Sequence, residues 1–135
     1  MNFEANVGLT FNGDCEAAFT LYAQLFAAKL DFVLTWGASP LADKAPRDWA
    51  TKVLFARLKG STMTLTGADV LPGSYRAPAG FNLRLSAGDA AEAERLFTAL
   101  ATGGTVRMPL ESTFFAKRYG EVVDRFGVPW EIRTR

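Results

Sequence analysis

The chain of 135 residues contains no histidine and only one cysteine, Cys15. The lack of histidine removes the commonest metal ligand and the commonest general base near neutral pH. A single cysteine cannot form an internal disulfide, so we expect a reducing, cytoplasmic setting. Cys15 falls at the start of a predicted helix, but its acidic neighbours Asp14 and Glu16 disfavour a thiolate. We therefore predict a structural rather than a reactive thiol.

Long apolar runs and an excess of one charge are also absent. No apolar run reaches the roughly 18 residues that a membrane span requires. The first residues, Met1–Glu4, show no basic region followed by an apolar stretch, so we expect no signal peptide. Fifteen basic and 14 acidic residues leave a net charge of +1, which gives no electrostatic basis for binding nucleic acid. We expect neither a membrane nor a nucleic acid as partner.

The periodicity of apolar residues predicts a strand, a helix and several further strands, twice over. Each helix follows a Gly-Asp pair, with Asp14 and Asp89 as predicted N-caps. The buried face of the first helix is predicted to be Phe19, Tyr22, Leu25 and Phe26, and that of the second Ala93, Leu96, Phe97 and Leu100. The predicted strands are 7–11, 30–36, 51–58 and 61–66 in the first half, and 81–85, 105–110, 119–124 and 128–133 in the second.

The two halves match each other at one offset around the helices and at a second offset in the final hairpins. Gly13-Asp14 matches Gly88-Asp89, and Leu65 matches Ile132. Any two amphipathic helices share some of this similarity, but the order of the elements agrees as well. We predict one domain, 1–135, with repeats at 1–67 and 80–135 and a linker rich in Gly and Pro between them. The predicted fold is α+β, with two βαβββ modules forming a curved mixed sheet around a cleft.

Several segments carry a family resemblance. They are LTFNGDCEAAF at 9–19, MPL at 108–110 and DRFGVPWEI at 124–132. The chain resembles PhnB-like proteins over nearly its whole length apart from the loop at 37–50. These belong to the glyoxalase, bleomycin-resistance and extradiol-dioxygenase group, the vicinal oxygen chelate superfamily. Some carry a 3-demethylubiquinone methyltransferase label, although nothing here resembles a motif for binding S-adenosylmethionine. The resemblance also implies a homodimer.

The resemblance implies four metal-ligand positions on the first and last strands of the two halves. Metal-dependent members have His, Gln or Glu there, whereas this chain is predicted to have Asn6, Thr64, Phe81 and Glu131. Asn6 aligns with Phe81, and Thr64 with Glu131. Only Glu131 is a good ligand for a divalent cation, and Phe81 cannot coordinate one. We therefore predict no metal and no other cofactor, although a one-residue shift of register would bring Glu4 toward the site.

Glu131 is the predicted functional carboxylate, acting as a general base or holding a polar group of a ligand. The alternative is a structural ion pair with an arginine such as Arg84 or Arg107. The aromatic residues predicted to line the cleft, with core packing as the alternative, are Phe55, Phe81, Phe114, Phe115 and Trp130. Asn6 and Thr64 complete the predicted ligand-binding set.

Three functions are compatible with these features. We favour a binder of a small apolar or aromatic molecule that lacks the usual metal site. The second is a PhnB-like lyase, isomerase or transferase, which requires Glu131 to be free of arginine partners. The third is a structural or interaction protein whose cleft is filled by its own side chains. The sequence identifies no ligand or pathway, and it leaves open whether the modules pair within one chain or between two.

Overall fold

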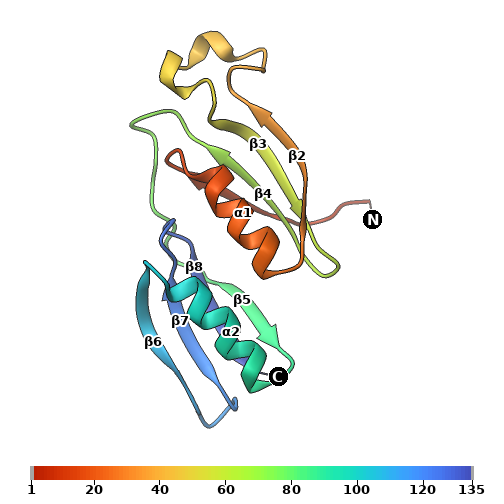
Figure 1. Cartoon of the computed structure of the whole chain (residues 1–135), viewed down its shortest axis with the longest axis vertical. Helices are drawn as coiled ribbons and strands as arrows, with labels where there is room; N and C mark the ends of the chain where they lie inside the picture. The colour runs from red at the N-terminus through yellow and green to blue at the C-terminus, as the bar shows by residue number, and fades with distance from the viewer. Residues whose placement is uncertain (1, 135) are drawn as a thin grey trace. The chain divides into compact units, whose positions relative to one another are not determined.

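A computed structural model describes residues 2–134 of the chain (Figure 1); the terminal residues of the two predicted repeats, Met1 and Arg135, lie outside the described residues. The chain divides into two compact units that meet at Arg76 and Ala77, inside the predicted linker. Each unit contains one α-helix and one four-stranded mixed sheet. The predicted α+β class and the doubled βαβββ order are confirmed. Among residues 2–134, no helix has the length and apolar character that crossing a membrane requires.

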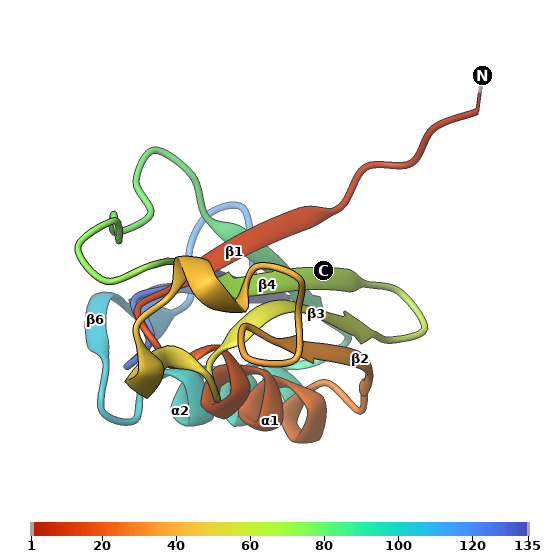
Figure 2. The same cartoon turned by 90° about the horizontal axis from the view of Figure 1, so that it is seen from above.

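The first unit places its sheet against its helix. Its elements are β1 (Val7–Phe11), α1 (Cys15–Leu25), β2 (Lys29–Thr35), β3 (Val53–Lys59) and β4 (Thr64–Asp69). The strand order is β1-β4-β3-β2, with β1 parallel to β4 and the other pairs antiparallel. Helix α1 lies along one face of this sheet (Figure 2). Alternate strand residues such as Phe11, Leu58 and Leu65 are buried with Phe19 and Tyr22 of α1, which is the core that the periodicity predicts.

The start of α1 differs from its prediction. Asp14 occupies the N-cap position, but its side chain makes no capping hydrogen bond. Asp69 of β4, 1% exposed, is the acceptor instead. Its Oδ1 accepts from the N–H groups of Gly13 at 2.9 Å and Cys15 at 3.0 Å, and its Oδ2 accepts from the N–H of Val53 at 2.8 Å. One buried carboxylate thus joins a helix start to two strands, and β4 extends three residues beyond its predicted end.

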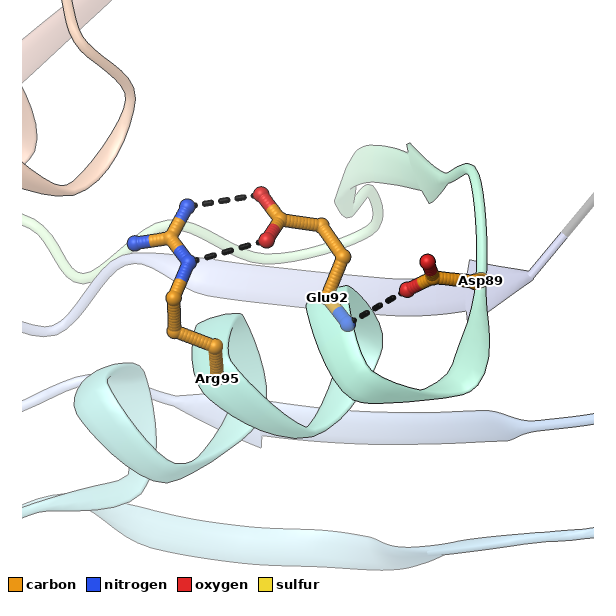
Figure 3. A network of polar contacts seen from close by, with 3 residues as sticks. All are labelled: Asp89, Glu92 and Arg95. Carbon is orange, nitrogen blue, oxygen red and sulfur yellow. Dashed lines mark hydrogen bonds and ion pairs between the residues drawn. The ribbon is translucent and has the colours of Figure 1, made fainter.

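The second unit repeats this arrangement. Its elements are β5 (Leu83–Ala87), α2 (Ala90–Ala101), β6 (Thr105–Glu111), β7 (Tyr119–Val123) and β8 (Pro129–Thr134), in the strand order β5-β8-β7-β6. The predicted N-cap is confirmed here, since Asp89 Oδ1 accepts from the N–H of Glu92 at 2.8 Å. Glu92 is in turn paired with Arg95 at 2.7 Å on the outer surface of α2 (Figure 3).

Trp130 belongs to the core of the second unit, against our prediction that it lines a cleft. It is 1% exposed, and its indole N–H donates to Asp124 Oδ2 at 2.9 Å. It pairs in register with Val122, and Ile132 pairs with Gly120. A Cβ on Gly120 would lie 2.7 Å from the ring of Phe97 on α2, so this set of alternate residues faces the helix. The core alternative is therefore correct for Trp130.

Candidate functional site

The face of the second sheet that points away from α2 carries a line of side chains across all four strands. Met108 of β6 pairs in register with Glu121 of β7, Glu121 pairs with Glu131 of β8, and Glu131 pairs with Arg84 of β5. Their strand neighbours Val122, Trp130 and Ile132 face α2, and side chains alternate between the faces of a strand. We call Met108, Glu121, Glu131 and Arg84 the Glu131 row.

Glu131 is held by an arginine within this row. Arg84 Nε donates to Glu131 Oε1 at 2.7 Å. The Glu131 side chain is only 9% exposed, whereas the Arg84 side chain is 60% exposed. The sequence left two interpretations open for Glu131, a functional carboxylate and a structural ion pair with an arginine. The structure contains the ion pair, and the arginine is Arg84.

The strand register shows that two predicted equivalences, Asn6 with Phe81 and Thr64 with Glu131, cannot both hold. Val7 pairs with Leu65, and Leu85 pairs with Ile132. If Leu65 corresponds to Ile132, as the sequence match predicts, the residue that corresponds to Asn6 is Arg84. The discrepancy arises between strand and helix, because Val7 precedes the first residue of α1 by eight positions and Leu85 precedes that of α2 by five. The residue that the structure places beside Glu131 is Arg84.

The residues at the predicted metal positions, with Arg84 in place of Phe81, do not fit the metal ion that the family resemblance implies. Asn6 and Thr64 offer neutral oxygens, Glu131 has one oxygen engaged, and Arg84 is a cation that repels a divalent ion. Over residues 2–134, no group of three or more His, Cys, Asp or Glu side chains is placed to hold a metal ion. The chemistry of these four side chains therefore argues against a metal centre.

Tyr119 is a further polar residue of this face. Its hydroxyl donates to Glu121 Oε2 at 2.8 Å. Burial raises the pKa of Tyr119 to about 12, aided by the hydrogen bond to Glu121 and by the charges of Glu131 and Glu121, while Arg84 opposes the shift. The phenol is therefore a proton donor throughout the neutral range. Tyr119 and Glu121 are two residues apart on one strand, so their side chains share a face. Because Glu121 pairs with Glu131, this spacing could have placed both residues on the face of Glu131.

An aromatic cluster adjoins the Glu131 row. The ring of Phe115 lies 5.0 Å from that of Tyr119 and 5.0 Å from that of Phe114, both edge to face. The guanidinium of Arg133 lies 5.5 Å from the centre of the Phe115 ring. Phe114 is fully exposed and Phe115 is 46% exposed. Phe115 thus lies beside Tyr119 and Arg133, which flank Glu121 and Glu131 on their strands, and Phe114 lies beside Phe115.

The other predicted site residues lie elsewhere. Phe81 precedes β5 and is 48% exposed. Phe55, Thr64 and Asn6 belong to the first unit, where Phe55 is 40% exposed and its ring lies 6.0 Å from that of Phe32. Thr64 is half-buried at the start of β4, and Asn6 is exposed before β1. That these three line one cleft together with the Glu131 row stays a prediction.

Comparisons with known proteins match this chain over nearly its full length. The family described as 3-demethylubiquinone-9 3-methyltransferase matches residues 4–133. Protein YjdN of Escherichia coli K12 is 31% identical, with 93% of this chain and 91% of YjdN aligned. The crystal structure of PA1353 from Pseudomonas aeruginosa is 38% identical, with a TM-score of 0.86 and 98% of both chains covered.

The chain is also similar to a structure from Bacillus cereus that is described as a putative 3-demethylubiquinone-9 3-methyltransferase, PhnB protein. It is 21% identical, has a TM-score of 0.85, and covers 98% of this chain and 100% of its own. A glyoxalase-related enzyme and a fosfomycin resistance protein, at 20% and 11% identity and TM-scores of 0.63 and 0.62, share the fold alone. The chain therefore belongs to the family described as 3-demethylubiquinone-9 3-methyltransferase, the PhnB-like family that its sequence resembles.

Proposed function

We propose that the protein binds a small organic molecule with an apolar or aromatic body, and that it does so without a divalent metal. The observation that carries this proposal is the ion pair between Arg84 and Glu131, because it engages the one strong ligand of the predicted metal set. The binding surface is the face of the second sheet that points away from α2. Phe114, Phe115 and Tyr119 supply aromatic contacts there, and the Glu131 row supplies polar ones.

The contact with Arg84 counts against the enzymatic alternative. A general base must reach the proton that it removes within hydrogen-bonding distance, and Oε1 of Glu131 is already bonded to the arginine. The sequence-based condition for that alternative, a Glu131 free of arginine partners, is not met. A filled, purely structural cleft is less favoured because Phe114 and Phe115 are solvent-exposed.

Metal content tests the metal-free part of the proposal. Protein purified without chelators and without a histidine tag is analysed for bound elements, together with Glu131→Ala. We expect far less than one metal ion per chain in both samples. Near-stoichiometric metal that disappears in Glu131→Ala would refute the proposal and indicate an enzyme with an unusual ligand set.

A thermal-shift screen of small aromatic molecules tests the binding part. Hits should stabilise the wild type and lose their effect in Phe115→Ala. Phe3→Ala is a matched control, because Phe3 is also exposed, at 77%, but precedes β1. Hits that respond equally to both substitutions would place the binding surface elsewhere.

We also propose that the protein is a homodimer, which the family resemblance supports, and that it acts in the cytoplasm, which its single cysteine favours. Sedimentation of the untagged protein tests the first, since a monomer at micromolar concentration would exclude a stable dimer.

A further inference from the structure

We propose that Arg84 contacts the ligand directly and that the ligand carries an oxyanion, a carboxylate or a phosphate, beside its apolar body. This inference rests on the proposed function and adds the charge and chemical class of the ligand. The guanidinium of Arg84 supplies a positive charge beside Glu131 on the exposed face of the sheet.

The hydrogen bonds of Arg84 leave its outer edge available. A guanidinium has five N–H donors in a planar fork. Glu131 takes the donor on Nε, and within residues 2–134 no hydrogen bond involves the two terminal nitrogens of Arg84. These nitrogens carry the pair of parallel N–H groups that matches the two oxygens of a carboxylate or phosphate. With its side chain 60% exposed, Arg84 is accessible to such a group.

Glu131 fixes the orientation of that fork before a ligand arrives. Its side chain is 9% exposed and belongs to β8, which lies between β5 and β7 in the sheet. A long arginine side chain loses rotamer freedom when it binds. Anchoring Nε on a buried carboxylate removes part of that freedom in the free protein, so less is lost when the ligand binds. Glu131 is on this view a positioning residue, and Arg84 is the ligand contact.

The charges nearby do not exclude an anion. Arg84 and Arg133 balance Glu121 and Glu131 on this face of the sheet. Glu121 is a strand further from Arg84 than Glu131 is, about 5 Å more, and it accepts a hydrogen bond from Tyr119. Glu111 on the edge strand β6 is exposed, where solvent and salt screen its charge. The nearest group that an incoming oxyanion meets at the β5 edge is therefore the guanidinium.

Three probes with one ring and different charges test the inference. They are benzoate, phenylphosphonate and benzylammonium, titrated into the protein while the arginine Nε–H and backbone amide resonances are followed by NMR. We expect one or both anions to bind and to shift the Arg84 Nε–H resonance, and the cation to bind more weakly. Benzoate and phenylphosphonate, compared with each other, distinguish a carboxylate site from a phosphate site.

Substitutions separate a ligand contact from a structural role. Arg84→Gln combined with Glu131→Gln removes both charges and leaves no buried carboxylate unpaired, so the fold is preserved. This double variant should bind the preferred anion about tenfold more weakly or worse, the size of a lost hydrogen bond to a charged group. Arg84→Lys keeps the charge but loses the fork and should also bind more weakly. Arg95→Gln, which breaks the ion pair with Glu92 on α2, is the control and should bind normally.

Two results would overturn the inference. One is benzylammonium binding as tightly as the anions, and the other is unchanged anion affinity in the double variant. If the cation or neutral benzyl alcohol binds on this face while the anions do not, only the oxyanion assignment fails. If none of the probes binds and the aromatic screen is also empty, the proposed function fails with it.

Discussion

Glu121 and Glu131 are direct partners in the antiparallel pairing of β7 and β8, so two carboxylates stand opposite each other on one face of the sheet. Like charges in this arrangement destabilise a sheet. Each carboxylate has its own donor, Tyr119 for Glu121 at 2.8 Å and Arg84 for Glu131 at 2.7 Å. These two donors, one neutral and one charged, offset the repulsion between the two carboxylates.

Tyr119 should lose its proton at a higher pH than an ordinary tyrosine. The hydrogen bond to Glu121 should be one cause of this raised pKa. The pKa of Tyr119 is about 12 in the folded protein, against about 10 in an unfolded chain. Because the folded pKa is the higher one, the contribution of Tyr119 to stability is complete below about pH 10 and is lost as pH rises toward about 12. Tyrosinate absorbance of the wild type minus Tyr119→Phe isolates this titration. Glu121→Gln should lower the pKa of Tyr119, and an unchanged titration would show that Glu121 contributes nothing to the shift.

Asp69→Ala should be among the most damaging single substitutions in the first unit. The change leaves three N–H groups without their acceptor, those of Cys15 and Val53, which are buried, and that of Gly13, which is partly buried. We expect a loss of about 3 kcal/mol or more in the free energy of unfolding, since each unsatisfied donor costs about 1 kcal/mol or more. Urea denaturation measures this loss.

Asp89→Ala is the matched comparison in the second unit. There the carboxylate caps a single N–H, that of Glu92, so the loss should be about 1 kcal/mol. Equal losses for Asp69→Ala and Asp89→Ala would mean that the three contacts of Asp69 contribute little beyond an ordinary helix cap.

These two aspartates also show where sequence reasoning succeeds and where it ends. Asp89 caps a donor three residues away, and the local pattern predicted it. Asp69 reaches Gly13 and Cys15 across more than 50 residues, and no local pattern carries that information. Periodicity located the β-strands and both α-helices of the described residues because burial alternates along the chain, but it missed the short 3₁₀ helices Ala42–Lys44 and Arg47–Trp49. It also could not identify which distant carboxylate closes the helix start.

The site was predictable to a similar extent. Glu131 and the aromatic pair Phe114 and Phe115 were predicted from residue type alone, and their role in a site stays a prediction. Arg84 was predicted only as one of two partners for Glu131, and the structure contains that ion pair. The helix starts were used as the common reference, while the register of parallel pairing, which decides what stands beside Glu131, is fixed by the connection between strand and helix. Trp130 was misplaced because consecutive residues of a strand point to opposite faces, so Trp130 and Glu131 cannot both line the same face of the sheet.

Gly120→Ala should destabilise the second unit through crowding. The added Cβ would lie 2.7 Å from the Phe97 ring and 3.0 Å from the backbone Cα of Leu110. Because the second contact is backbone, rotation of a side chain cannot relieve it, and we expect a loss of about 1–3 kcal/mol. Gly88→Ala is the control, since no atom lies within 4 Å of its added Cβ. Thermal unfolding of both variants compares them, and equal midpoints would contradict the close packing of α2 on β7.

Cys15 should be unreactive in the folded protein. Its side chain is fully buried, and burial, together with the charges of Asp69 and Glu16, raises the pKa of the thiol far above its ordinary value. Only the thiolate reacts with iodoacetamide. Mass spectrometry after treatment at mildly alkaline pH should find little alkylation without urea and nearly complete alkylation in urea. Rapid labelling of the native protein would refute the structural role assigned to this residue.

The coupling between Arg84 and Glu131 should be visible in stability as well as in binding. Arg84→Ala leaves a buried carboxylate without its donor, and we expect a loss of about 1–2 kcal/mol, less than for a fully buried pair because Arg84 is largely exposed. Adding Glu131→Gln removes the unpaired charge, so the double variant should be more stable than the two single losses predict, with a coupling of about 1 kcal/mol. Urea denaturation of the four proteins completes this cycle. Strictly additive losses would mean that the 2.7 Å contact contributes nothing to folding, and Arg84 would then lack the fixed orientation on which its assignment as a ligand contact depends.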